Sequence, residues 1–213
     1  MNHSSTAPQD RPSKRDDILA AALQLFSERG FHGTAVPLVA QAAHVGAGTI
    51  YRYFESKQSL VNALYRQCKE HILAFMLAGF PFDAAPREQF REFWRRLAAF
   101  AHGHPHAFSF LELHYHAPYL DAESLRLEQT ALELAGSFIR QTQRAGITRN
   151  AHPEALIALV WGAFVGLVKA EKAGHLRLDD DIIRQTAESC WDALRAANGS
   201  PEDRPSPARE ETT

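Results

Sequence analysis

Residues 34–57, TAVPLVAQAAHVGAGTIYRYFESK, predict two short helices joined by a tight turn. The first helix begins at Thr34 or Val36, and its apolar residues recur at helical spacing and are mostly small, which suits two closely crossing helices. The turn is residues 43–46, AHVG, and helix-turn-helix units often use glycine in such a connection. His44 stands where the turn requires left-handed backbone, which histidine tolerates better than most non-glycine residues. The stretch therefore predicts a helix-turn-helix.

The second helix of this unit, residues 47–54, has an unusual outer face. Ile50 and Phe54 lie four residues apart and are expected to pack on the preceding helices. Glycine inside a helix costs about 1 kcal/mol relative to alanine, a cost expected where the backbone must approach another surface closely. Threonine, tyrosine and arginine bind phosphates and base edges, so this helix is predicted to lie in a DNA groove. The outer face and its flanks combine small and hydrogen-bonding residues, namely Gly48, Thr49, Tyr51 and Arg52, while Tyr53 is expected near the inner edge.

A helix is predicted on each side of this unit. Apolar residues at helical spacing predict one over residues 15–29, with Gly30 as its left-handed stop and Phe31 folding back on Phe26. After the unit, Ser56 is expected to cap another helix, with Lys57 in its first turn. A cation there opposes the helix dipole unless an anion is present, so a phosphate contact is the favoured interpretation and an exposed lysine without a role is the alternative.

The composition of the 213 residues is typical of a soluble globular protein, with 45% hydrophobic and 23% charged residues. Residues 11–57 carry six basic and four acidic side chains, a net charge of +2. Because the whole chain has a net charge of −2, the remaining residues have a net charge of −4. This asymmetry favours DNA binding by the N-terminal part alone. No apolar stretch approaches the roughly 18 residues of a membrane span, no secretory signal is recognisable, and Cys68 and Cys190 are too few for a disulfide framework. We therefore expect a cytoplasmic protein without a membrane partner.

Residues 15–64 resemble the DNA-binding domain of the TetR family of transcriptional regulators, above all in G-T-I-Y-R-Y-F (48–54) followed by S-K-x-x-L-V (56–61). The resemblance implies an all-α fold, in which an N-terminal three-helix helix-turn-helix DNA-binding domain is joined to a larger helical ligand-binding and dimerisation domain. It also implies a homodimer that represses transcription from a pseudo-palindromic double-stranded DNA operator. A small-molecule effector releases the protein from this operator. The protein is expected not to be an enzyme and to have no cofactor. The residues that match the family's usual DNA contacts are Thr34, Ala47, Gly48, Thr49, Tyr51, Arg52, Tyr53 and Lys57.

Two positions depart from the family pattern. His44 replaces the common turn glycine, and Ala47 stands where many members carry a longer polar side chain. Alanine cannot hydrogen-bond a base and at most touches a thymine methyl group. Base reading is therefore expected to depend on Thr49 and Arg52.

Composition predicts the tails and periodicity the helices, while the resemblance implies the two domains. We expect disordered tails at residues 1–13 and 198–213, because both are polar and rich in proline. The DNA-binding domain is expected over residues 14–60 and the ligand-binding and dimerisation domain over residues 61–197. Further helices are predicted up to residue 77 and over residues 86–101, 107–116, 121–145, 154–172 and 179–196.

The larger domain contains many aromatic residues but no comparable motif. Most of these residues are expected in the core, and the resemblance implies that a subset lines an effector cavity between helices. The candidate lining residues are Phe93, Trp94, Leu97, Phe108, Leu111, His114, Tyr115, Phe138, Trp161 and Phe164.

A dimer interface is predicted on the last two helices. Gly162 and Gly166 form a G-x-x-x-G pattern, and small residues four apart let two helices approach closely. These helices could meet their symmetry mates as a four-helix bundle, although burial within one subunit remains the alternative. The candidate interface residues are Trp161, Gly162, Val165, Gly166, Ile183, Ala187, Trp191 and Leu194.

A histidine cluster supports a rival hypothesis, a metal-dependent enzyme. Within one predicted helix, His116 is the only histidine of the cluster with a possible ligand at the i, i+4 spacing of helical metal ligands, namely Glu112. No metal site is therefore predicted. A third hypothesis keeps the DNA-binding domain but has no small-molecule effector. The cluster consists of His102, His104, His106, His114 and His116.

Overall fold

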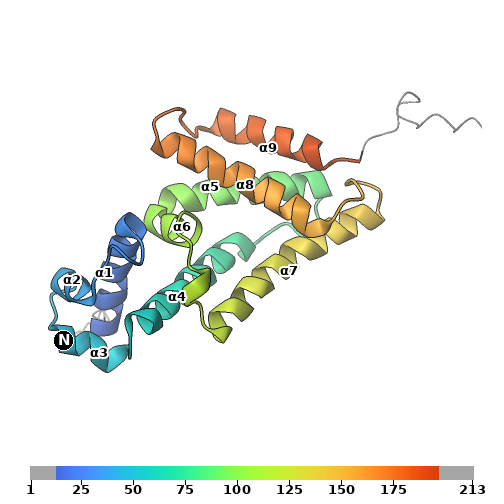
Figure 1. The fold of residues 1–213 in the computed structure, drawn as a ribbon. Coiled ribbons are helices and arrows are strands. Elements are labelled where there is room, and N and C mark those ends of the chain that lie inside the picture. Colours follow the sequence, from blue (N-terminus) through green and yellow to red (C-terminus); the bar gives the residue numbers. More distant parts are fainter. Residues whose placement is uncertain (1–12, 197–213) are drawn as a thin grey trace, which may run out of the picture. The chain divides into compact units, whose positions relative to one another are not determined.

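The computed structural model describes residues 13–196. Their regular secondary structure is helical apart from one isolated β-bridge between Thr148 and Arg195, and turns and loops join the helices (Figure 1). The all-α prediction is therefore confirmed, whereas the predicted tails lie, except for Ser13, outside the described residues. The helices are α1 (Lys14–Arg29), α2 (Val36–Ala42), α3 (Ala47–Tyr53), α4 (Lys57–Leu77), α5 (Pro86–Gly103), α6 (Pro105–Glu112), the 3-10 helix η1 (Ala117–Tyr119), α7 (Ala122–Arg144), α8 (Pro153–Lys172) and α9 (Asp180–Leu194).

The described residues form two compact units. The first contains residues 13–80 and 95–131, and the second contains residues 81–94 and 132–196. Helices α5 and α7 each contribute residues to both units.

Capping residues set the ends of the first helices. Ser13 caps α1 through a capping box with Asp16, because Ser13 Oγ accepts a hydrogen bond from Asp16 N and the Asp16 carboxylate accepts one from Ser13 N. At the other end, Gly30 has a φ of 66°, and the ring of Phe31 stacks on that of Phe26 with centroids 6.4 Å apart. The predicted left-handed stop and the fold-back of Phe31 are thus confirmed.

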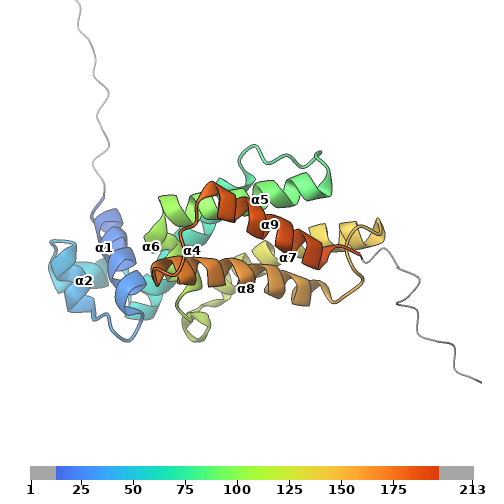
Figure 2. The same ribbon diagram turned by 90° about the horizontal axis from the view of Figure 1, so that it is seen from above.

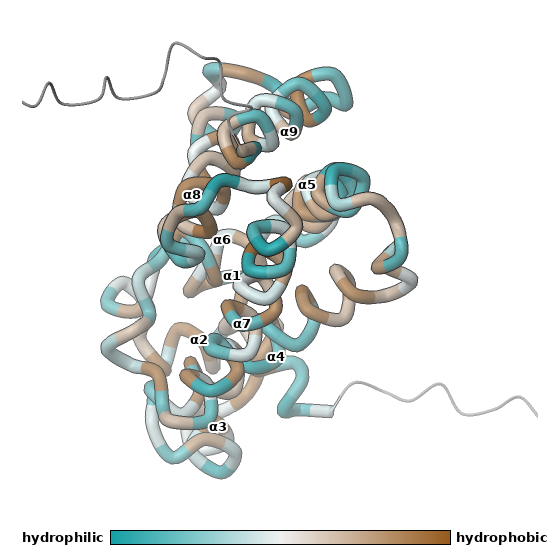
Figure 3. Tube along the Cα trace, turned by 90° about the vertical axis from the view of Figure 1, so that its right-hand side faces the viewer, coloured by the Kyte–Doolittle hydropathy of each residue, from teal (hydrophilic) through white to brown (hydrophobic). Residues whose placement is uncertain are grey.

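The head, α1 to α3 with the start of α4, has its own apolar core. Phe26 and Val39 are fully buried, and Ile50 and Leu60 are almost fully buried. In the hydropathy colouring of Figure 3, hydrophobic and hydrophilic residues alternate along the helices, as expected when each helix has one apolar face. The core therefore holds α3 from its inner side and leaves its outer side open.

One glycine in the head is required by a close backbone approach. A Cβ at Gly33 would lie 2.4 Å from the Arg29 carbonyl oxygen, which is a clash between backbone atoms. We expect Gly33→Ala to lower the free energy of unfolding by about 2 kcal/mol, as overpacking does. Chemical denaturation followed by circular dichroism measures this change.

The matched control is Gly48→Ala in the same head. A Cβ at Gly48 meets nothing within 4 Å, so this variant is expected to gain up to about 1 kcal/mol from helix propensity. Equal unfolding free energies for the two variants would contradict the steric assignment of Gly33.

In the second unit, α8 and α9 run side by side (Figure 2). Trp94 of α5 is fully buried, its ring meets that of Phe164 edge-on at 5.3 Å, and its indole Nε1 donates to Thr186 Oγ1 over 3.1 Å. Trp191 of α9 packs on Phe90 with ring centroids 5.5 Å apart. These contacts bind α8 and α9 to the first turns of α5.

Two details differ from the sequence prediction. The helix expected over residues 107–116 begins at Pro105, because proline is tolerated in a first helical turn, and it ends at Glu112. On α7, the spacing of the apolar residues predicts that Leu125 and Leu132 face inward, but both are more than 40% exposed.

Candidate DNA-binding surface

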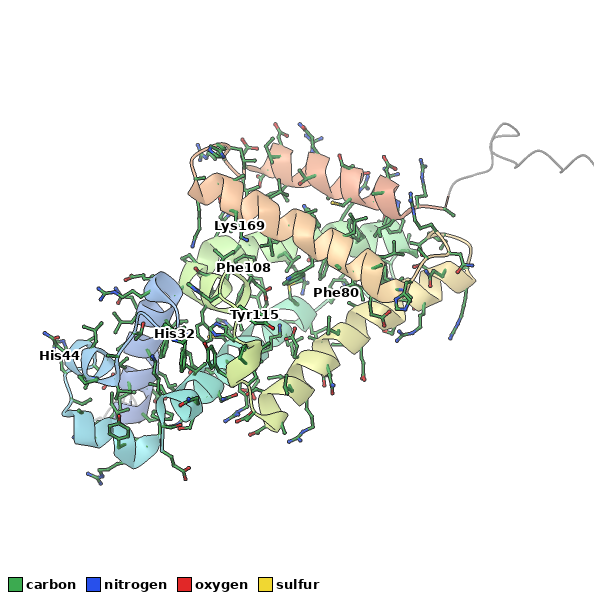
Figure 4. The ribbon with its side chains drawn as sticks, viewed as in Figure 1. His32, His44, Phe80, Phe108, Tyr115 and Lys169 are labelled. Atoms are coloured by element: carbon green, nitrogen blue, oxygen red, sulfur yellow. The ribbon has the colours of Figure 1, made fainter. Side chains whose placement is uncertain are left out.

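The turn between α2 and α3 has the predicted left-handed residue. His44 has a φ of 54° and is the one non-glycine residue with positive φ in the described part of the chain. Val45 N donates to Ala40 O over 3.0 Å, which closes the turn directly after α2. His44 itself is exposed and lies on the surface of the head (Figure 4). The turn thereby sets the direction in which α3 leaves α2.

Helix α3 is held from below by two apolar residues. Ile50 and Phe54 are buried, as predicted. The Arg15 guanidinium of α1 lies 5.6 Å from the centroid of the Phe54 ring, a distance at which a cation is attracted to the ring. The anchored side of this seven-residue helix therefore faces α1 and α2.

The opposite side of α3 carries the hydrogen-bonding residues. Tyr51 and Tyr53 are 55% and 46% exposed, Arg52 is exposed, and Thr49 is half-buried. Among residues 13–196 no contact explains why position 48 is glycine, since a Cβ there would have open space around it. A helix with a bare backbone patch beside tyrosine and arginine can approach a phosphate backbone and a base edge together.

Lys57 lies in the first turn of α4, which Ser56 caps as predicted. Ser56 Oγ accepts a hydrogen bond from Ser59 N over 3.1 Å. The ammonium of half-buried Lys57 donates to the Phe31 carbonyl oxygen and lies 4.1 Å from the centroid of the Phe31 ring. Burial lowers the pKa of Lys57 below its usual value. The lysine is thus fixed beside the α1–α2 connection rather than extended into solvent.

The prediction that Thr34 contacts DNA must be corrected. Its side chain is 0% exposed, and its hydroxyl points to the carbonyl oxygens of Leu25 (3.2 Å) and Gly30 (3.0 Å). The hydroxyl therefore ties the α1–α2 connection to the end of α1. Thr34 does not cap α2, because the N-cap residue is Ala35, which makes no side-chain capping hydrogen bond. We leave the Thr34 side chain out of the candidate surface and keep Ala47, Gly48, Thr49, Tyr51, Arg52, Tyr53 and Lys57.

The sequence did not reveal how the head is tied to α6. Three side chains converge on Ser27 of α1: His106 Nδ1 lies 2.8 Å from its hydroxyl, while Ser109 Oγ (3.2 Å) and His114 Nε2 (2.9 Å) reach its carbonyl oxygen. These contacts join residues about 80 positions apart, for which periodicity contains no signal.

Three histidines of the cluster hydrogen-bond to protein groups, His106 and His114 to Ser27 and His116 to Phe110. His116 Nε2 lies 2.5 Å from the Phe110 carbonyl oxygen, and burial lowers the pKa of His116. Glu112, its i−4 neighbour, instead faces Lys69 at 3.9 Å. Within residues 13–196, no group of three or more histidine, cysteine or acidic side chains is placed to hold a metal ion.

A buried polar cluster connects α4, α6 and α7 in the first unit. Lys69 is only 8% exposed, and its ammonium lies 2.6 Å from Glu128 Oε2, which also accepts a hydrogen bond from the Tyr65 hydroxyl over 2.6 Å. Burial, and then the bond to Glu128, raise the pKa of Tyr65. The single amino group of Lys69 thus offsets two carboxylates, those of Glu112 and Glu128.

The ten candidate pocket residues divide equally between the two units. In the second unit, Trp94 and Phe164 are buried against each other, and Phe93, Phe138 and Trp161 are half-buried. In the first unit, Leu97, Phe108 and Leu111 are buried and His114 is half-buried. The prediction that Tyr115 lines the cavity is corrected. Tyr115 is 79% exposed on the segment after α6 (Figure 4) and cannot line an enclosed cavity in this conformation.

The candidate dimer residues on α8 and α9 differ in their exposure to solvent. Gly162 and Gly166 are exposed on α8, and Trp161, Val165 and Ile183 are half-buried. On α9, by contrast, the apolar side faces its own subunit, so the assignment of three residues to an interface is corrected. The three residues, all buried, are Ala187, Trp191 and Leu194.

The outer side of α8 is apolar and lacks cover within the described residues. Ala155, Ala158 and Leu159 are exposed in line with the two glycines, and a Cβ at either glycine meets nothing within 4 Å. By length and composition alone, α8 is long and apolar enough to cross a membrane, so the expectation that no stretch approaches a membrane span is corrected. We name Ala155, Ala158, Leu159, Gly162 and Gly166 the α8 stripe.

Two family models match the chain. "Bacterial regulatory proteins, tetR family" matches residues 18–64, and "Tetracyclin repressor-like, C-terminal domain" matches residues 64–196. Among characterised relatives, the HTH-type transcriptional regulator RutR of Escherichia coli K12 is 30% identical over 185 residues, which cover 83% of this chain and 86% of that protein. The HTH-type transcriptional regulator UidR of the same strain is 38% identical over 60 residues, or 28% of this chain and 31% of that protein.

Solved structures have the same fold. A putative TetR family transcriptional regulator from Vibrio parahaemolyticus superposes with a TM-score of 0.70 at 29% identity, over 86% of this chain and 99% of that one. A putative tetR family regulator from Shewanella sp. PV-4 superposes with a TM-score of 0.76 at 23% identity, over 87% and 100% of the two chains.

Proposed function

This chain belongs to the tetR family of bacterial regulatory proteins and is a DNA-binding transcriptional regulator, and on that premise we propose that it is a cytoplasmic repressor released from its operator by a small molecule. Residues 14–60 are the proposed DNA-binding domain, and residues 61–197 are the proposed ligand-binding and dimerisation domain. The observation that carries the proposal is the exposed polar side of α3, which is anchored from behind by Ile50 and Phe54.

On DNA, α3 enters the major groove with its exposed side toward the bases. Arg52 donates to base edges, and the guanidinium suits guanine O6 and N7. Tyr51 and Lys57 bind phosphates, while Gly48 lets the helix backbone approach the duplex. Two heads of a dimer would reach successive major grooves, about 34–36 Å apart along the duplex, so the operator is expected to be pseudo-palindromic.

We expect Arg52→Ala to weaken operator binding and to relax base preference at one position of each half-site. A bidentate arginine contact discriminates by about 1–3 kcal/mol, so the preference for that base should fall by about 5- to 150-fold. The operator is first located by footprinting the DNA beside the protein's own gene, and affinities for all four bases at each position are then measured by fluorescence anisotropy.

Two comparisons sharpen this test. Tyr51→Ala should weaken binding to all sequences alike, because a phosphate contact does not depend on the base. Arg144→Ala removes an exposed arginine from the far end of α7 and should leave both affinity and preference unchanged. If Arg52→Ala kept the wild-type preference at every position, Arg52 would have to be removed from the recognition surface.

The proposed dimer forms through the α8 stripe of two copies. Small exposed residues let the two α8 helices approach closely, and a second copy supplies an apolar cover of the same shape. Dimerisation through α8 also explains why glycine occupies positions 162 and 166, where neither glycine is required by contacts within the subunit.

The proposed effector binds in the larger domain. Effector and operator then weaken each other's binding by the same factor, because their coupling free energy is reciprocal. Operator release in the presence of candidate compounds tests this part of the proposal. A regulator that remains on its operator with every compound class would favour the alternative without an effector.

A further inference from the structure

Lys57 is held by a stack of aromatic rings that reaches outside the N-terminal family match. The ring of Tyr119 in η1 lies nearly parallel to that of Phe31, with centroids 3.9 Å apart and an angle of 15°. The Lys57 ammonium lies 4.1 Å from the same Phe31 centroid. A ring stacked this closely leaves no room for an ammonium on its own side, so Lys57 and Tyr119 occupy opposite faces of Phe31.

Tyr119 is itself fixed from three directions. Its hydroxyl lies 2.7 Å from His32 Nε2, and its carbonyl oxygen accepts a hydrogen bond from Asn62 Nδ2 over 2.7 Å. The buried Asn62 side chain also accepts a hydrogen bond from Asp121 N over 2.8 Å. Asn62 belongs to α4, the helix whose first residue is Lys57. Tyr119 is therefore bound both to Phe31 and to the helix that carries Lys57.

This arrangement determines the position of Lys57. The lysine gives one proton to the Phe31 carbonyl oxygen, and an ammonium has two more protons to donate. Phe31 also stacks on Phe26, and its carbonyl oxygen accepts a hydrogen bond from Thr34 N over 3.4 Å. The cation depends on Phe31 twice, through its carbonyl oxygen and through its ring. If Phe31 moves, Lys57 loses both partners.

We propose that Tyr119 is a positioning residue of the DNA interface, which holds Phe31 so that Lys57 presents its free protons to a DNA phosphate. The inference rests on the proposed role of Lys57 as a phosphate contact. Tyr119 lies in the segment between α6 and α7, within residues 64–196 and outside the N-terminal match at residues 18–64. A shift of this segment in the larger domain therefore alters a phosphate contact without moving α3.

A double-mutant cycle tests the proposal in the full-length protein. Operator affinity is measured by fluorescence anisotropy at several salt concentrations for the wild type, Lys57→Gln, Tyr119→Leu and the double variant. Loss of one phosphate contact lowers the slope of log affinity against log salt by about 0.9 per subunit. We expect this reduction for each single variant, and no further loss in the double variant. Tyr119→Phe keeps the stack and should keep the wild-type slope.

The possible failures can be told apart. An unchanged slope for Lys57→Gln would remove the phosphate contact, and with it the premise. The positioning role alone would be overturned if Lys57→Gln reduced the slope as expected and Tyr119→Leu left the slope unchanged or bound the operator more tightly. Additive losses in the double variant would overturn it as well.

A second measurement needs no variant and therefore does not depend on whether Tyr119→Leu folds. The chain has five lysines, so the side-chain ε-CH2 resonances of ¹³C-labelled lysine can be assigned by NMR. The Phe31 ring should shift the Lys57 resonance upfield in the free protein, and the shift should persist when operator is added. A resonance that returns to the position of the other lysines on operator binding would show that Lys57 leaves Phe31, which contradicts the proposal.

Discussion

Replacing Lys69 by methionine is expected to lower the free energy of unfolding by about 3 kcal/mol. Removal of one partner of a buried ion pair costs about 3–5 kcal/mol, and we take the lower end because the side chain of Glu128 is 34% exposed and water screens it. Methionine fills the space of the lysine stem but leaves the carboxylates of Glu112 and Glu128 without their shared cation. Urea denaturation followed by tryptophan fluorescence and circular dichroism measures the loss.

Two variants separate the ion pair from a general effect of losing a lysine. Lys14→Met changes an exposed lysine in the first turn of α1 and should stay within about 0.5 kcal/mol of the wild type. Adding Glu128→Gln to Lys69→Met should recover part of the stability, because the amide oxygen still accepts the hydrogen bond from Tyr65 and the charge of Glu128 is removed. A second substitution that lowered the stability further would contradict this account.

The pH dependence of the Lys69→Met deficit has a defined sign. Burial alone raises the pKa of Glu128, but the Lys69 ammonium and the hydrogen bonds from Lys69 and Tyr65 outweigh it, so the pKa lies below its ordinary value of 4.5. The wild-type pair therefore stabilises the fold fully above pH 4.5 and loses this contribution as the pH falls through the lowered pKa. Without Lys69, burial leaves the pKa of Glu128 raised, and protonation removes the unpaired charge. The deficit should be largest at neutral pH and should shrink in acid.

Gly162→Arg is expected to abolish dimerisation and to reduce operator affinity by about 10²- to 10⁴-fold, the range by which linking two binding sites strengthens binding. Position 162 has open space within the subunit, so the arginine does not disturb its own fold. Between two α8 helices, however, it places a charge and a long side chain where the proposed interface has only apolar residues. Analytical ultracentrifugation gives the oligomeric state, and fluorescence anisotropy gives the affinity.

Gly103→Arg is the matched control, since it is the same substitution at an exposed glycine with open space, in the last turn of α5. It should leave the dimer and the operator affinity unchanged. A dimeric Gly162→Arg protein with normal affinity would place the interface elsewhere. A monomeric variant with unchanged unfolding behaviour of the subunit would support the α8 stripe.

The sequence predicted most of the local structure of the head. Gly30, His44 and Ser56 are a helix stop, a left-handed turn residue and a helix cap, and all three were predicted because such effects depend on a few neighbouring residues. The burial of Ile50 and Phe54 followed from a spacing of four. Thr34 was misassigned because the partners of its hydroxyl, on Leu25 and Gly30, are not visible in a sequence pattern.

By itself, the sequence determined the all-α fold, the helix-turn-helix and the hydrogen-bonding outer face of α3, because these depend on periodicity and on residues within one or two turns of each other. Only the tertiary structure decided that the apolar side of α9 faces inward while that of α8 remains open, since two apolar helices have the same pattern whether they pack on their own subunit or on another. It alone also placed Tyr119 on Phe31, and Phe31 on Lys57, across 88 and 26 positions of the chain. Contacts over such distances depend on how the helices pack, which no local pattern of residues records.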